Sequence, residues 1–237
     1  MTRWLLTCEH GGNHVPARWR YLFRGAESVL ESHRGWDRGS LDVFRALEPE
    51  IADAAFPAQL TRLLVDLNRS VGHRHLFSAY TRTLATAEKQ QILDQHYLPW
   101  RKAVEDRVND WRKAEHTVLH VSVHSFTPEL DGHRRNADIG LLYDPGRPLE
   151  RKLSRDWRQL LTELAPDIRV RMNYPYRGTA DGFTRRLRTV HPTGYAGIEL
   201  ELNEGSMARR AARITAAVLD STRRLRAGFC PATEPAS

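Results

Sequence analysis

The chain has 237 residues, an apolar share of 41% and a formal charge of +7, from 36 Lys and Arg against 29 Asp and Glu. This length is enough for one large α/β domain with a buried core, and no apolar run approaches the length of a membrane helix. The cysteines, Cys8 and Cys230, lie at opposite ends and match no disulfide or zinc-ribbon spacing, so we expect a reducing, cytoplasmic location. The basic residues are mostly arginines spread among carboxylates. We therefore expect no nucleic-acid partner and no membrane association, and an anionic small-molecule substrate explains the excess charge.

The N-terminal region pairs an apolar segment with a polar, glycine-rich loop. Residues 4–8 (WLLTC) are typical of a buried strand, and the loop that follows, EHGGNHVP, contains His10. Further along, Ser40 is expected to cap a helix that begins at Leu41 and buries one apolar face. Asp37 lies just before this predicted helix.

The next predicted elements are a strand, a loop and a long helix. Residues 59–66 (QLTRLLVD) are predicted to form a second buried strand, and residues 70–84 have no regular period. Residues 85–114 carry apolar residues at helical spacing, with Pro99 expected to kink or break the helix.

The central predicted strand lies within residues 117–128 (TVLHVSVHSFTP). It is short, β-branched and apolar, and it runs into His124 before Pro128, which cannot continue a strand ladder. Open α/β sheets bind their ligands at the carboxyl ends of strands. Because His10 and His124 both follow buried strands, we predict a metal site between them.

The remaining chain alternates strands with helices. Strands are expected over residues 139–143, 168–172 and 197–204, helices over 149–164 and 206–226, a site-mouth loop over 173–182 and a flexible tail over 228–237. This alternation predicts a three-layer α/β/α sandwich in a single domain spanning residues 1–237, with a core of about 3–227.

Polar residues cluster at the ends of several predicted strands. The members of this group are His10, Asp66, Asn68, Arg69, His124 and Glu201. Neutral imidazoles and a carboxylate suit a single Zn²⁺ per chain with a position open for water. Arg69, supported by Asn68, offers a planar fork for a substrate carboxylate. Glu199 and Glu201 share one strand face, and Glu201 is the predicted general base because it is nearer the carboxyl end, with Glu199 as the alternative.

Several segments resemble the N-formylglutamate amidohydrolase family. They are residues 8–16 (CEHGGNHVP), 33–39 (HRGWDRG), 62–69 (RLLVDLNR) and 123–128 (VHSFTP), continued by 173–182 and 197–203. The similarity extends over about residues 4–206, with its motifs in the family's order. It implies a mixed sheet between helical layers, as in phosphorylase/hydrolase-like zinc peptidases, and hydrolysis of a linear, non-peptide C–N amide bond.

The resemblance also implies roles for individual residues. The metal ligands would be His10, His124 and Asp37, with Glu9 or Asn13 as alternatives to Asp37. Carboxypeptidase-like sites place an acidic ligand three residues after the first His, and here that position is Asn13.

A second group of residues is implied in substrate binding. It comprises Asp66, Asn68 and Arg69, with Arg62, Arg135, Asn173 and Tyr176 as further candidates. The implied substrate is a small anionic N-formyl or N-acyl amino acid such as N-formylglutamate. A zinc amidase acting on a cell-wall peptide or another acylated amine, and a metal-free basic binding protein with the same fold, remain the alternatives.

Overall fold

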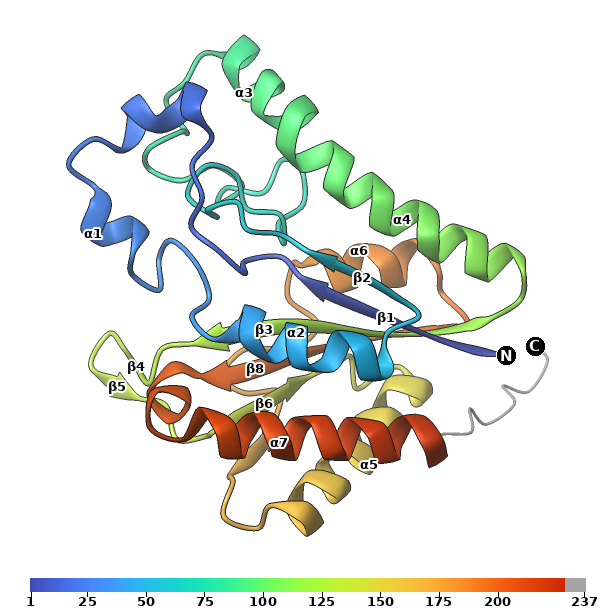
Figure 1. Ribbon diagram of the computed structural model, residues 1–237. Helices are drawn as coiled ribbons and strands as arrows, with labels where there is room; N and C mark the ends of the chain where they lie inside the picture. Colours follow the sequence, from blue (N-terminus) through green and yellow to red (C-terminus); the bar gives the residue numbers. More distant parts are fainter. Residues whose placement is uncertain (229–237) are drawn as a thin grey trace.

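A computed structural model describes residues 1–228, which form a six-stranded mixed sheet between two layers of helices (Figure 1). The strands in spatial order are β2 (Ala54–Pro57), β1 (Thr2–Cys8), β3 (Thr117–Phe126), β8 (Tyr195–Asn203), β6 (Ile139–Leu142) and β7 (Val170–Met172). Neighbouring strands run parallel except β6 and β8, which are antiparallel. The predicted three-layer sandwich with a mixed sheet is confirmed. A small hairpin, β4 (Glu129–Leu130) and β5 (His133–Arg134), stands apart from the sheet.

The helices divide between the two faces of the sheet (Figure 1). One face is covered by α2 (Ser40–Ile51), α5 (Pro148–Leu164) and α7 (Glu204–Gly228), and the other by α4 (Leu98–Lys113) and α6 (Phe183–Val190). The shorter elements are the 3₁₀-helix η1 (Ala17–Phe23), α1 (Glu27–Leu30), α3 (Thr86–Ile92) and the π-helical turn η2 (Leu93–Tyr97). In the part of the chain that the structure describes, no helix is both long enough and apolar enough to cross a membrane.

Side-chain alternation along the central strands separates an apolar face from a partly polar one. Leu119, Val121 and Val123 of β3 join the large core beneath α2, α5 and α7. The alternate residues of β3 point to the α4 and α6 side, where Val118 packs in a smaller core with Tyr195 of β8. This smaller core covers the amino-terminal ends of the two strands. Their carboxyl ends on the same face carry polar side chains, which places a site there.

The prediction of a strand over residues 59–66 is wrong. The chain makes only an isolated bridge at Leu60 and then a turn. The edge strand beside β1 is instead β2, which was not predicted. Leu63, Leu64 and Val65 are nevertheless buried, in a cluster with residues of η1 and η2. An apolar run indicates that a segment is buried but not how. Here the segment is buried by loop packing and not by pairing in the sheet.

Two predicted helix details have different outcomes. Ser40 does not cap α2, because Gly39 precedes the helix in a left-handed conformation (φ +79°) and the Ser40 hydroxyl donates to the Asp37 carbonyl at 2.6 Å. The expected interruption at Pro99 is present. The predicted helix divides into α3 and α4 around the π-helical turn η2, and Pro99 follows this turn as the second residue of α4, where a missing N–H costs little.

The strands β7 and β8 and the helices α5 and α7 agree closely with their predicted ranges. The helix α6 was not predicted. Its buried residues, Phe183, Thr184, Leu187 and Arg188, follow helical spacing. The helix α7 is interrupted at Arg210 (φ −149°, ψ 41°). The predicted tail begins at Gly228, the last residue of α7, and its residues 229–237 lie outside the described part of the chain.

Candidate active site

Four segments distant in sequence meet at the carboxyl edge of the sheet. His124 of β3 lies beside Glu201 of β8, its direct partner in the parallel register. His10 follows β1, and its carbonyl accepts a hydrogen bond from the Asp37 amide at 2.9 Å, which joins the two loops. These residues open onto a cavity of about 180 Å³. The other residues that line it are Arg62, Asn68, Arg69, Ser125, Tyr176, Arg177, Ala180, Asp181 and Glu199.

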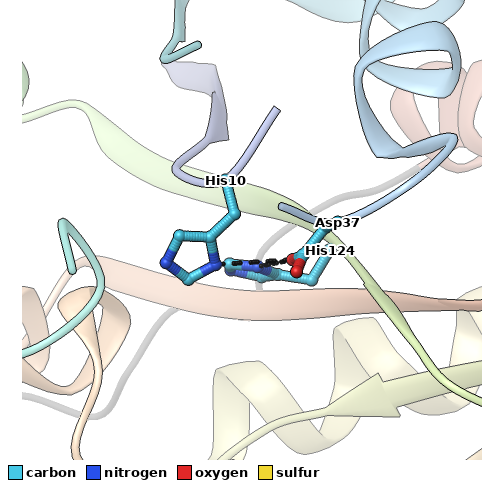
Figure 2. A group of neighbouring side chains, drawn as sticks. All are labelled: His10, Asp37 and His124. Carbon is cyan, nitrogen blue, oxygen red and sulfur yellow. Dashed lines mark hydrogen bonds and ion pairs between the residues drawn. The ribbon is translucent and has the colours of Figure 1, made fainter. Parts of the chain in front are cut away.

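His10, Asp37 and His124 form a compact buried group (Figure 2). The Asp37 Oδ2 atom lies 2.8 Å from His124 Nδ1 and 3.4 Å from His10 Nδ1. One potential ligand atom from each side chain lies within 4.8 Å of the other two, and the three residues are at most 3% exposed. Two imidazole nitrogens and a carboxylate oxygen are a common ligand set for zinc.

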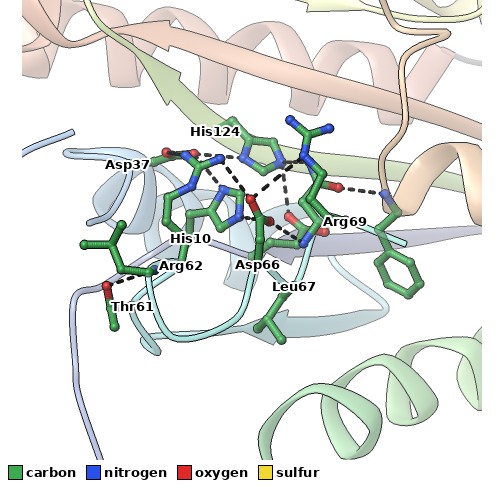
Figure 3. A network of polar contacts seen from close by, with 12 residues as sticks. His10, Asp37, Thr61, Arg62, Asp66, Leu67, Arg69 and His124 are labelled. Carbon is green, nitrogen blue, oxygen red and sulfur yellow. Dashed lines mark hydrogen bonds and ion pairs between the residues drawn. The ribbon is translucent and has the colours of Figure 1, made fainter. Parts of the chain in front are cut away.

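The outer sides of these ligand candidates are held by a second carboxylate and an arginine (Figure 3). Asp66 Oδ1 lies 2.7 Å from His10 Nε2, so it orients the ring from behind. Arg62 donates to Asp37 Oδ1 at 2.9 Å and to Asp66 Oδ2 at 3.4 Å. Burial would raise the pKa of Asp37, but the charges of Arg62 and His10 hold it well below its ordinary value. Of these two residues, both predicted to bind substrate, Asp66 therefore lies behind the possible metal ligands, whereas Arg62 contacts both carboxylates and also lines the cavity.

The arrangement passes a simple test of fit to a metal ion. His10 Nδ1 is buried and has no hydrogen-bond partner within residues 1–228, although it faces the Asp37 carboxylate. A buried nitrogen without a partner is uncommon and here has a ready explanation as a ligand atom. The alternative ligands are placed elsewhere. Asn13 donates to the Glu31 side chain at 2.8 Å, and Glu9 Oε2 lies 3.3 Å from His124 Nε2, on the side of the ring away from Asp37.

Glu201 and Glu199 differ in their surroundings. Glu201 is 4% exposed, and its Oε2 atom has no hydrogen-bond partner among the described residues. Burial raises the pKa of Glu201 to about 8, although the neighbouring His124 opposes the shift. Glu199 instead accepts a hydrogen bond from Thr184 Oγ1 at 2.7 Å. Of the two carboxyl groups, Glu201 thus has an oxygen at the cavity that no described residue engages.

The predicted substrate-binding residues are brought to the cavity only in part. Arg69 lines it and donates to the Asp181 carbonyl, and Asn68 Oδ1 accepts from the Phe183 amide at 2.7 Å. Tyr176 lines the cavity and accepts a hydrogen bond of 3.0 Å from Arg135, which itself lines a neighbouring groove of about 490 Å³.

Asn173 does not line the cavity. Its Oδ1 atom accepts hydrogen bonds from the Tyr143 amide at 3.0 Å and the Gly178 amide at 3.1 Å. The side chain therefore holds the loop of residues 173–182 against the end of β6, and it has a structural position where substrate binding was predicted.

Arg177 was not predicted as a site residue. It lines the cavity from the loop of residues 173–182, where its carbonyl accepts from the Ala180 amide at 3.0 Å, but its guanidinium makes no ion pair or hydrogen bond with any residue that the structure describes. Arg62 and Arg69, by contrast, are already engaged by protein oxygen atoms. The prediction that this loop lies at the site mouth was the available signal, since an arginine in such a loop can face an anionic substrate.

Comparisons with known proteins agree with the geometry. The model of the N-formylglutamate amidohydrolase family matches residues 2–207. A structure of a gene product from Agrobacterium tumefaciens is 26% identical with a TM-score of 0.74, covering 94% of this chain and 92% of the other. The N-formylglutamate amidohydrolase structure from Ralstonia eutropha is 17% identical with a TM-score of 0.70, covering 96% and 95%. No curated protein sequence matches the chain. Its extensive family match shows that this chain belongs to the N-formylglutamate amidohydrolase family and is a hydrolase of non-peptide C–N amide bonds.

Proposed function

We propose that the protein is a zinc-dependent hydrolase that removes the acyl group from an N-formyl or N-acyl amino acid resembling N-formylglutamate. The observation that carries the proposal is the convergence of His10 Nδ1, His124 Nδ1 and Asp37 Oδ2 beside the carboxyl group of Glu201. These three residues would hold the ion. Action in the cytoplasm is part of the proposal, because the spacing of Cys8 and Cys230 matches no disulfide framework.

The residues around the cavity have different roles in the proposed reaction. When bound, zinc supplies a Lewis acid that polarises the amide carbonyl and lowers the pKa of water. Glu201 accepts the proton of the attacking water and then returns it to the departing amine nitrogen. Both transfers need a carboxyl group with a pKa near the working pH, and burial moves the pKa of Glu201 in that direction. Arg62 keeps Asp37 ionised and in place.

Substrate carboxylates would be held by arginines at the cavity wall. Arg69, with Asn68 beside it, extends across the wall near His124 (Figure 3). Arg177 is the stronger candidate for a side-chain carboxylate, because its guanidinium is not engaged by another described residue. Holding the substrate at both ends would fix the scissile carbonyl against Glu201.

The first experiment is elemental analysis of the purified protein beside His124→Ala, followed by hydrolysis of N-formylglutamate, N-formyl-leucine and a cell-wall muropeptide. We expect about one zinc per chain, as in a mononuclear site, and loss of metal and activity in the variant. No metal-dependent hydrolysis of any N-acyl amino acid would overturn the proposal, and cleavage of the muropeptide alone would move the substrate class.

Arginine variants test how the substrate is held. Arg69→Ala and Arg177→Ala should each lower kcat/KM for N-formylglutamate by about tenfold or more, the scale of one charge-assisted hydrogen bond. Arg177→Ala should leave N-formyl-leucine hydrolysis nearly unchanged. Arg134→Ala is the control for net charge, because Arg134 is exposed on β5 outside the cavity. An equal loss on both substrates would contradict the role of Arg177.

A further inference from the structure

A continuous chain of buried polar groups extends from His124 into the protein. His124 Nε2 lies 2.9 Å from Ser122 Oγ, which lies 2.7 Å from Glu9 Oε2. The other carboxylate oxygen of Glu9 lies 2.7 Å from Thr7 Oγ1, which lies 2.7 Å from His120 Nε2. The chain ends where His120 Nδ1 meets the Tyr195 hydroxyl at 2.7 Å. Every member is at most 3% exposed.

The direction of each hydrogen bond follows from Glu9. Each of its two carboxylate oxygens is engaged by a hydroxyl group, Oε1 by Thr7 and Oε2 by Ser122, and a carboxylate only accepts hydrogen bonds. The short contacts to Thr7 and Ser122 each need a hydrogen, and only the two hydroxyl groups can supply it. Ser122 Oγ, having donated to Glu9, must accept from His124 Nε2.

The other half of the chain is satisfied by the same assignment. Thr7 Oγ1 accepts from His120 Nε2, and the Tyr195 hydroxyl donates to His120 Nδ1. This requires a neutral His120, and burial lowers the pKa of His120 to about 4. A single arrangement of hydrogens therefore satisfies five consecutive contacts, which an arrangement with the opposite direction at Ser122 cannot do.

The consequence for the site lies at His124. A hydrogen held on Nε2 leaves Nδ1, the atom that faces Asp37, able to act as a ligand through its lone pair. Asn68 Nδ2 also lies near Nε2, at 3.5 Å. The Asn68 amide is oriented by the hydrogen bond that its Oδ1 accepts from the Phe183 amide, and Nδ2 itself carries hydrogens, so it offers no acceptor to Nε2. The contact to Ser122, at 2.9 Å, is the closer one.

We propose that Glu9, acting through Ser122, is a positioning residue that selects the His124 tautomer whose Nδ1 atom binds the metal. Asp66 holds His10 Nε2 directly at 2.7 Å, whereas Glu9 reaches His124 Nε2 through the Ser122 hydroxyl and by a longer direct contact of 3.3 Å. This inference rests on the proposed metal site and assigns Glu9 a place outside the ligand set.

The test measures zinc affinity by competition with a chromophoric chelator, so it does not depend on activity. In Glu9→Gln the side-chain amide can no longer accept hydrogen bonds from both Thr7 and Ser122. Ser122→Ala removes the hydroxyl group that links Glu9 to His124. Each variant should weaken zinc binding by about 10- to 100-fold, the usual effect of losing an outer partner of a metal-binding histidine. The double variant should lose little more than either single variant, because both act through one hydrogen bond.

Two matched controls separate this role from general packing. Glu150→Gln makes the same change at another fully buried carboxylate, and Ser221→Ala truncates a buried serine that contacts Trp157 and Val218. Both should retain wild-type zinc affinity at a temperature where they are folded. If Glu9→Gln proves unfolded, Ser122→Ala still decides the question, since it leaves every charge in place.

The outcomes separate the two proposals. Zinc bound equally by wild type, Glu9→Gln and Ser122→Ala would overturn the role of Glu9 and leave the metal site intact. Equal losses in Ser122→Ala and Ser221→Ala would overturn it too. A wild-type protein that binds no zinc would overturn the metal site itself and the inference built on it.

Discussion

The molecule contains two buried ionic clusters that differ in how completely their polar atoms are satisfied. In the first, Glu150 Oε1 lies 2.8 Å from Arg188 Nε and 3.0 Å from the Gly197 amide, while Glu150 Oε2 accepts from the Asp144 amide at 2.8 Å. Arg188 also donates to the carbonyls of Gly178 and Gly197. Both carboxylate oxygens of Glu150 and all three guanidinium nitrogens of Arg188 have hydrogen-bond partners, Arg147 Nε adds an ion pair of 3.4 Å to Glu150 Oε1, and the cluster joins α5, α6 and β8.

The second cluster is the site around His10, Asp37 and His124. Within the described residues, it leaves His10 Nδ1 and Glu201 Oε2 buried without a hydrogen-bond partner. An unsatisfied buried polar atom costs about 1–3 kcal/mol of folding free energy. Charge and burial alone therefore do not distinguish a structural cluster from a functional one. The distinguishing feature is a set of unsatisfied polar atoms that converge on a cavity.

The largest change in stability is expected for Glu150→Ala. It leaves Arg188 buried without its carboxylate, so the free energy of unfolding of the metal-free protein should fall by about 3–5 kcal/mol. Urea unfolding measures this loss. Activity per folded molecule should stay near that of the wild type, and a selective loss of activity without loss of stability would show that this cluster is not purely structural.

Glu201→Gln should have the reverse effect. The amide cannot carry the proton between water and the leaving amine, so kcat should fall by about 100-fold or more. Steady-state hydrolysis of N-formylglutamate measures the loss, and circular dichroism checks that the fold is kept. If Glu201→Gln retained activity while Glu199→Gln lost it, the base would be Glu199.

The stability of the metal-free protein should also depend on Glu201 and pH. With a folded-state pKa of about 8 against an ordinary 4.5, Glu201 retains in the folded state a proton that the unfolded chain has released. Its contribution is therefore fully present below about pH 4.5 and is lost as pH rises through about 8. Wild type should lose about 1–3 kcal/mol more than Glu201→Gln between pH 5 and pH 8, the scale of one to two pKa units. Parallel pH profiles of urea stability would contradict this.

The smallest expected effect is on the reactivity of Cys8, which lies on the apolar face of the sheet close to the site. Burial raises the pKa of Cys8 to about 12, and its thiol lies 3.4 Å from Ser40 Oγ. In a Cys230→Ser background, a thiol reagent at pH 8 should leave native protein unmodified and label it fully in denaturant. Rapid labelling of the native protein would show that the sheet opens beside the cavity.

Part of the fold was predictable because strand periodicity is local. The alternation in β8 put Glu199 and Glu201 on one face, the apolar run of β3 predicted a strand leading into His124, and the predicted ranges of β1 and β6 agree with the structure. The run over residues 59–66 misled because buried loops and buried strands share the same apolar composition.

The site residues show the same division. Sequence alone placed His10 after one buried strand and His124 at the end of another, although β3 continues past His124 to Phe126, and the family resemblance added Asp37. It could not decide which carboxylate faces both imidazoles, since that depends on how the loop before α2 meets the loop after β1. Asp66, predicted to bind substrate, instead lies behind His10.

What the sequence by itself determined is the set of residue types at the strand ends and the face on which each strand side chain lies, because both follow from neighbours along the chain. Only the tertiary structure decided the partners. The parallel register sets His124 beside Glu201, and the packing of separate loops sets Asp37 in front of the histidines and Glu9 behind His124. Register and loop packing depend on contacts between segments far apart in sequence, which local patterns do not encode.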